Sequence, residues 1–160
     1  MIRPALSSDL PVIWRLVREL ARYERLEHEV VGTEDDFRVH VFGESPRAEV
    51  LLAIETDATV VGMAMYFHTF SSFLARPGIH VEDLFVLPEH RRRGWGRALL
   101  HAVAGLALSR GCGRVEWSVL HWNDPARNFY KKLGAATMDD WRLCRVAGEA
   151  LARLGSEPSL

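Results

Sequence analysis

The stretch IHVEDLFVLPEHRRRGWGRALLHAVAGLAL, residues 79–108, decides the fold prediction. Its first part is rich in β-branched and aromatic residues and reaches Pro88, which predicts a strand that ends there. Its last part repeats apolar residues at helical spacing up to Gly111, which predicts a helix. Between them lies RRRGWG, residues 91–96. The middle of the chain is therefore a strand, a glycine-containing turn and a helix.

Upstream of this stretch, the sequence predicts two helices and a β-hairpin. Apolar residues recur on one helical face between residues 8 and 25: Leu10, Ile13, Trp14, Val17, Leu20 and Ala21. A second helix is expected from Thr33, because Thr33 and Asp36 have the spacing of a capping box. The β-rich runs 49–55 and 60–70 are separated by a short polar segment, which is typical of an antiparallel hairpin, and Gly62 suggests a bulge.

Downstream, residues 114–120 form another predicted strand, followed by a short helix. Asp124 is the expected cap of that helix, with Pro125 at its first position and Gly134 just beyond its end. Residues 137–146 are the predicted last strand. No repeat or linker divides the chain, so we expect one domain over residues 1–160, built on a mixed α/β sheet of about six strands.

Composition excludes several classes of protein. The chain has 160 residues, 48% of them hydrophobic, and 20 basic against 21 acidic residues, a net charge of −1. This balance provides no general attraction for nucleic acid, and no apolar run is long enough to cross a membrane. Only Cys112 and Cys144 occur, without metal-ligand spacing, so neither a disulfide framework nor a metal site is expected. A cytoplasmic location is the resulting expectation.

The RRRGWG turn has the features of an anion-binding site. Backbone amides in such a turn converge on one point, and the following helix contributes the positive end of its dipole. The sequence lacks the Lys-Ser/Thr of the P-loop and the three glycines of the dinucleotide-binding fingerprint. The alternative interpretation is a tight turn made by Gly94 and Gly96, with solvated arginines around it.

Two motifs in their order, VLPEHRRRGWG (86–96) and NDPARNFYKKLG (123–134), resemble the GCN5-related N-acetyltransferase (GNAT) family. With IRPA (2–5), ELARYE (19–24) and VEDLFV (81–86), the chain is most similar to the diamine (spermidine/spermine) acetyltransferase group and its thialysine-acetylating relatives. The resemblance implies a GNAT fold of the α/β (α+β) class. Its sheet is mixed, mostly antiparallel, with about six to seven strands and helices on both faces.

The resemblance implies acetyl transfer from acetyl-CoA, without a metal, to a primary amine of a small polyamine or diamine, by direct attack in a ternary complex. Glu82 occupies the position of the base that takes the amine proton, and Tyr130 that of the acid that protonates the leaving thiolate. The implied acetyl-CoA contacts are Leu84, Phe85, Val86, Arg91, Arg92, Arg93, Gly94, Trp95, Gly96, Arg97, Asn123, Ala126 and Tyr130. The implied acceptor contacts are Tyr23, Glu24, Glu82 and Asp139. Trp95 departs from the family pattern, which has a small or branched residue between the two glycines.

Several alternatives stay open at this level. Further acids, at Glu27, Glu29, Asp83 and Asp140, are interpreted as facing water. The segments GC, residues 111–112, and VLHWN, residues 119–123, are closer to the thialysine type, so thialysine or another lysine-like amino acid is a second candidate acceptor. A non-catalytic acyl-CoA sensor is the candidate from another class, and the presence of Glu82 and Tyr130 disfavours it. The resemblance also implies a homodimer, with residues 137–154 at the contact.

Overall fold

The computed structural model describes residues 1–156; the last four residues, which end the polar stretch GSEPSL, lie outside the described part. The chain divides into two compact units, Met1–Ser118 and Val119–Leu160, and each is described by itself. The single domain predicted from the sequence stays a prediction. No helix within residues 1–156 is long and apolar enough to cross a lipid bilayer.

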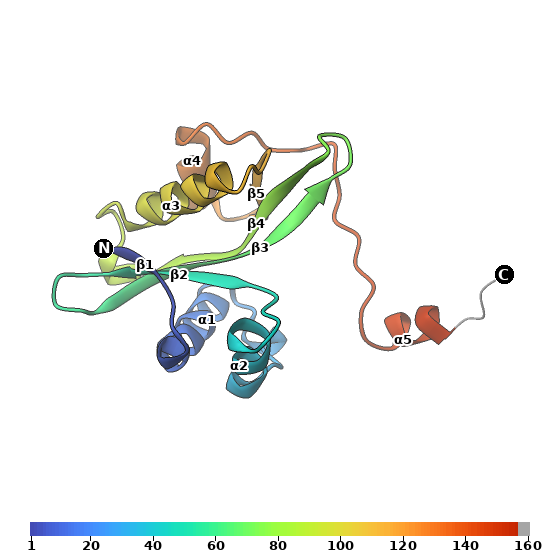
Figure 1. Cartoon of the computed structure of the whole chain (residues 1–160), viewed down its shortest axis with the longest axis horizontal. Coiled ribbons are helices and arrows are strands. Elements are labelled where there is room, and N and C mark those ends of the chain that lie inside the picture. The colour runs from blue at the N-terminus through green and yellow to red at the C-terminus, as the bar shows by residue number, and fades with distance from the viewer. Residues whose placement is uncertain (157–160) are drawn as a thin grey trace. The chain divides into compact units, whose positions relative to one another are not determined.

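The first unit is built on a five-stranded sheet in the order β1-β2-β3-β4-β5 (Figure 1). Its strands are β1 (Ile2–Pro4), β2 (Glu49–Ile54), β3 (Val60–Ser71), β4 (Arg76–Val86) and β5 (Val115–Trp117). The pairs from β1 to β4 are antiparallel, whereas β4 and β5 are parallel and are connected through helix α3 (Trp95–Ser109). This confirms the mixed, mostly antiparallel sheet, with five strands rather than six to seven.

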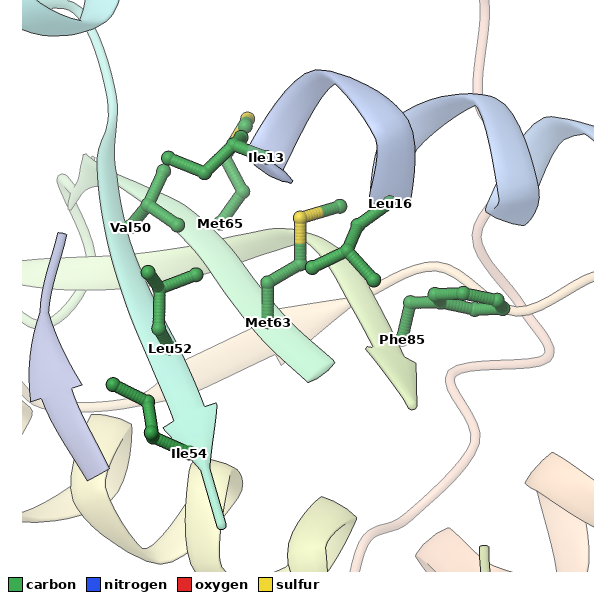
Figure 2. Close-up of a cluster of buried hydrophobic side chains, with 8 residues drawn as sticks. All are labelled: Ile13, Leu16, Val50, Leu52, Ile54, Met63, Met65 and Phe85. Atoms are coloured by element: carbon green, nitrogen blue, oxygen red, sulfur yellow. The ribbon is translucent and has the colours of Figure 1, made fainter. Parts of the chain in front are cut away.

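Helices cover both faces of this sheet. Helices α1 (Leu10–Glu24) and α2 (Glu34–Phe42) lie on one face and α3 on the other (Figure 1). Ile13 and Leu16 of α1 pack on the sheet in a cluster of eight buried side chains (Figure 2). Its sheet residues are Val50, Leu52, Ile54, Met63, Met65 and Phe85. Burial of each large side chain contributes about 1.5–3 kcal/mol, so this cluster fixes α1 against β2, β3 and β4.

The short 3₁₀ helices η1 (Ser7–Asp9), η2 (Glu27–Glu29) and η3 (Pro88–His90) complete the unit. The predicted capping box is confirmed, because the Asp36 amide donates to the Thr33 hydroxyl and the Thr33 amide to the Asp36 carboxylate. The β2–β3 register shifts beside Gly62, as expected. A Cβ on Gly62 would lie 2.6 Å from the Phe85 carbonyl oxygen, so glycine permits the close approach of β3 and β4.

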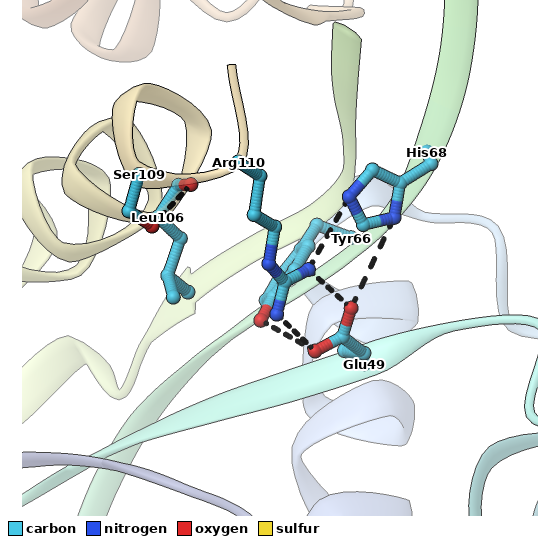
Figure 3. Close-up of polar contacts among 6 residues, drawn as sticks. All are labelled: Glu49, Tyr66, His68, Leu106, Ser109 and Arg110. Atoms are coloured by element: carbon cyan, nitrogen blue, oxygen red, sulfur yellow. Dashed lines mark hydrogen bonds and ion pairs between the residues drawn. The ribbon is translucent and has the colours of Figure 1, made fainter. Parts of the chain in front are cut away.

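A polar network ties the end of α3 to the sheet (Figure 3). Arg110, the residue after α3, donates through both terminal nitrogens to Glu49 at 2.5 and 2.8 Å, and Tyr66 Oη donates to the same carboxylate at 3.2 Å. Burial, followed by the charge of Glu49, raises the pKa of Tyr66 to about 12. His68 Nε2 lies 3.3 Å from Arg110. The network fixes the C-terminal end of the helix whose N-terminal end forms the anion-binding turn.

The second unit contains α4 (Asp124–Lys132) and α5 (Gly148–Ser156). Asn123, not Asp124, is the cap of α4, because its side chain accepts from the Ala126 amide while Asp124 is already helical. Pro125 is at the second position of α4 rather than the first, because the helix begins at Asp124, whereas Gly134 lies just beyond its end as expected, with a φ of 87°. The strand predicted over residues 137–146 is wrong: the segment is irregular, and no strand in the described residues pairs with it. An apolar run needs such a partner for its backbone to form a strand.

Candidate active site

The anion-binding turn lies between η3 and α3, where the sequence predicts it. Gly94 is the N-cap of α3 with a φ of 88°, and Arg92 is also left-handed with a φ of 62°. No side chain of the described residues caps the first turn of α3, and that turn contains no acidic residue. A helix start of this kind has free amides and the positive end of the helix dipole, which can accept an anionic group such as a pyrophosphate.

One edge of β4 is open directly before this turn. The parallel ladder with β5 ends at the pair Val81 and Trp117, so residues 83–86 pair with β3 alone in the described chain. The register with β3 also shifts between Val81 and Asp83, which makes Glu82 the extra residue of a β-bulge. Backbone groups along this edge can pair with the amides of a pantetheine arm.

Arg91 connects the turn with the end of α1. Its Nε donates to the Val86 carbonyl at 2.9 Å, and its guanidinium lies 4.4 Å from the centre of the Tyr23 ring and 5.6 Å from that of Phe85. Such stacking of a guanidinium on an aromatic face is favourable. The structure thus brings together Arg91, an expected acetyl-CoA contact, and Tyr23, an expected acceptor contact.

Three carboxyl groups lie near one another: Glu24 at the end of α1, and Glu82 and Asp83 on β4. Burial, together with the charges of Glu82 and Glu24, raises the pKa of Asp83 to about 7, and burial also raises the pKa of Glu24. Among the described residues, none of the three forms an ion pair with a lysine or arginine. Among residues 1–156, the basic side chain that approaches this group is His80, whose Nε2 lies 3.9 Å from Glu82 Oε2.

The burial of Asp83 corrects the interpretation that the additional acids all face water. Glu27, Glu29 and Asp140 are exposed, but Asp83 is not. Period-two alternation was a usable signal for this, because Asp83 lies two residues before the buried Phe85 and pairs with the buried Met65 of β3. An acidic cluster without a lysine or arginine partner, one of whose carboxyl groups is half-buried, favours the binding of a cation.

The other expected site residues belong to the second unit. Asn123 is buried, and its side-chain oxygen accepts from the Ala126 amide at 3.3 Å, which fixes the start of α4. Tyr130 on α4 is half-buried, with its ring centre 5.3 Å from that of Phe129. Asp139 is exposed. Among residues 1–156 there is no group of His, Cys, Asp and Glu side chains that could hold a metal ion.

Comparison with known protein families identifies the chain. A family model described as the acetyltransferase (GNAT) family matches residues 13–135. The chain belongs to the GNAT family. It is therefore an acetyl-transferring enzyme, and GNAT enzymes use acetyl-CoA as the acetyl donor.

Individual relatives agree with this assignment. The GNAT chain is 37% identical over 167 residues to thialysine N-epsilon-acetyltransferase of Bos taurus, with 98% of each chain covered. It is 34% identical to L-ornithine N5-acetyltransferase of Arabidopsis thaliana, covering 94% of this chain and 85% of the relative. A human spermidine/spermine N(1)-acetyltransferase-like protein is 29% identical, over 98% of this chain and 24% of that protein. A solved integron cassette protein from V. cholerae has a TM-score of 0.81 at 27% identity, covering 98% of both chains.

One contact of the turn of residues 91–96 was not predicted from the sequence. Glu55, directly after β2, lies 3.3 Å from Arg93 and 3.0 Å from His90. These partners are 38 and 35 residues away in sequence, and no motif connects them. Arg92, Arg93 and Arg97 are all exposed.

Proposed function

We propose that this GNAT enzyme transfers the acetyl group of acetyl-CoA to a primary amine of a small polyamine or diamine. The pyrophosphate would lie on residues 91–97, with amides of the turn and the first turn of α3 as donors. The pantetheine arm would pair with the open edge of β4 at Leu84, Phe85 and Val86. A backbone N–H of the same edge would stabilise the tetrahedral oxyanion. Asn123 and Ala126 would line the arm.

The observation that carries the acceptor proposal is the uncompensated group of Glu24, Glu82 and Asp83. A polyamine brings several positive charges, and these carboxylates supply charges of opposite sign next to the open edge of β4. Tyr23, held by Arg91, provides an aromatic face beside them. Asp139 is proposed as a further acceptor contact.

Two residues are proposed to move protons. An alkylamine has a pKa of about 10 and arrives protonated, so a base must take a proton before the nitrogen attacks the thioester carbon. Glu82 is that base, directly or through water, and its exposed position on the bulge supports exchange of the proton with solvent. Tyr130 donates a proton to the CoA thiolate as the carbon–sulfur bond breaks.

The second candidate acceptor is the side-chain amine of a lysine-like amino acid. Relatives named for thialysine and ornithine acetylation support it. Such an acceptor presents one ammonium at the reacting end and a zwitterion at the other. Its carboxylate needs a cationic partner, which a polyamine does not.

The test is thiol release from acetyl-CoA with spermidine, spermine, putrescine, thialysine, ornithine, lysine and a lysine peptide. The proposal expects the highest kcat/KM with a polyamine or diamine. A preference for thialysine or ornithine would replace it with the second candidate. CoA release with no amine in the panel accelerating it would contradict both.

The enzyme is further proposed to be a homodimer in the cytoplasm, with residues 137–154 in the contact. Support comes from large apolar side chains that this segment exposes: Met138, Trp141, Leu143, Val146, Leu151 and Leu154. A second copy would remove this apolar surface from water. Sedimentation at micromolar concentration is expected to give a dimer, and a single species of 18.1 kDa would contradict it.

A further inference from the structure

The Glu55 carboxylate lies between the end of β2 and the turn of residues 91–96, which is called the donor turn below because it is the proposed site of acetyl-CoA. Its side chain is 22% exposed, and its backbone is fixed on both sides: the Glu55 amide donates to the Thr59 carbonyl at 2.9 Å, and the Ala58 amide donates to the Glu55 carbonyl at 3.1 Å. The carboxylate therefore occupies a defined position at the end of β2. It is not a freely moving surface charge.

The Glu55 carboxylate contacts two residues at the donor turn, His90 and Arg93. Oε1 lies 3.0 Å from His90 Nδ1 and 3.3 Å from Arg93 Nη1. Because an ionised carboxylate only accepts, His90 carries its proton on Nδ1 in this contact. Hydrogen bonding from His90, the charges of His90 and Arg93 and hydrogen bonding from the Trp95 side chain hold the pKa of Glu55 below its usual range.

The two partners lie on either side of Arg92. His90 ends η3, and Arg93 lies within the turn. Between them, Arg92 adopts a left-handed φ of 62°, which costs about 1–2 kcal/mol for a residue with a side chain. A turn in this conformation needs contacts from outside to hold it.

We propose that Glu55 is a positioning residue that holds the turn of residues 91–96 in the conformation that binds the pyrophosphate of acetyl-CoA. The inference rests on the proposed donor site and assigns a role to a residue outside it.

Removal of the Glu55 carboxylate is expected to weaken acetyl-CoA binding, which is the opposite of the effect expected from its charge. By charge alone, a carboxylate beside a phosphate site repels the ligand, so its removal would tighten acetyl-CoA binding. Positioning predicts the opposite, because a released turn must be ordered again when the ligand binds. The sign of the change in Kd therefore separates the two effects.

Glu89 supplies a matched control. It is an acid of the same type in η3, next to His90, and it is exposed and makes no side-chain bond in the described chain. Glu89→Gln removes a negative charge near the turn and leaves its contacts intact. Glu55→Gln removes the same charge but weakens the contacts to His90 and Arg93, and Glu55→Ala removes them.

The experiment is isothermal calorimetry of acetyl-CoA binding to the wild type and these three variants. Glu55→Ala is expected to bind about tenfold more weakly, the equivalent of ordering about one released residue. Glu55→Gln, which keeps an acceptor oxygen, should lie between Glu55→Ala and the wild type, and it serves as the test if the alanine variant does not fold. Glu89→Gln should stay within about twofold of the wild type or bind more tightly.

Kinetics distinguish positioning from general damage. The KM for acetyl-CoA should rise in Glu55→Gln, while kcat at saturation and the KM for the amine stay at wild-type values. Glu55→Gln binding as tightly as Glu89→Gln, or more tightly than the wild type, would overturn the inference and leave the proposed function standing. A wild type that binds no acetyl-CoA would overturn both.

Discussion

Asp83→Asn should stabilise the protein above neutral pH and remove a pH dependence of stability that the wild type shows. The pKa of Asp83 in the fold is about 7 against an ordinary value of 3.8, so the folded state binds this proton more tightly than the unfolded chain. Wild-type stability should then fall as pH rises from about 4 to about 7. The difference corresponds to about 4 kcal/mol at full ionisation, at 1.36 kcal/mol per pKa unit. Asparagine is neutral throughout and lacks this fall.

The assay is urea denaturation at about pH 5 and about pH 8. Asp83→Asn should gain up to about 4 kcal/mol in free energy of unfolding over the wild type at the higher pH, and much less at the lower. Glu89→Gln, an exposed acid, should change it by less than about 0.5 kcal/mol at either pH. The added stability should be accompanied by a higher KM for polyamine, because the variant removes a charge from the proposed acceptor site. Parallel pH profiles for Asp83→Asn and the wild type would refute the reasoning.

Three further predictions concern the donor site and the chemical step. Gly96→Val places a branched side chain in the first turn of α3 and should weaken acetyl-CoA binding at least about tenfold by calorimetry; unchanged affinity would remove the pyrophosphate from this turn. Tyr130→Phe should lower kcat by about 10²-fold or more with acetyl-CoA affinity nearly intact, whereas near-wild-type turnover would make Tyr130 a packing residue. Glu82→Gln should abolish the low-pH limb of the rate profile, so that rate rises with pH as free amine becomes available. An unaltered profile would move the base elsewhere, with Asp83 the first alternative.

Much of the first unit could be predicted from the sequence, because local patterns there agree with the tertiary contacts. The apolar face of residues 8–25 packs on the sheet, and the capping box at Thr33 forms as its spacing indicates. The glycine turn between a strand and a helix is likewise where residues 91–96 predict it. These elements can be predicted from the sequence because the local pattern and the fold favour the same structure.

The predictions that did not hold depend on information that a local pattern does not contain. Residues 137–146 have the apolar content of a strand, but a strand also needs a neighbour, and none in the described chain pairs with it. The environment of Asp83 depends on its neighbours in space, Met65 of β3 and the charges of Glu24 and Glu82, of which Glu24 is distant in sequence. The contacts of Glu55 join residues far apart in sequence, and only the folded chain brings them together.

The most direct test of the central claim is the stoichiometry of products. The wild-type enzyme is incubated with acetyl-CoA and its best amine from the panel, free CoA is measured with a thiol reagent, and the N-acetylated amine is measured by mass spectrometry. The account predicts equal amounts of CoA and N-acetylated amine, formed at a rate that depends on both substrates. CoA released without a matching amount of acetylated amine, or no turnover with any amine, would contradict it.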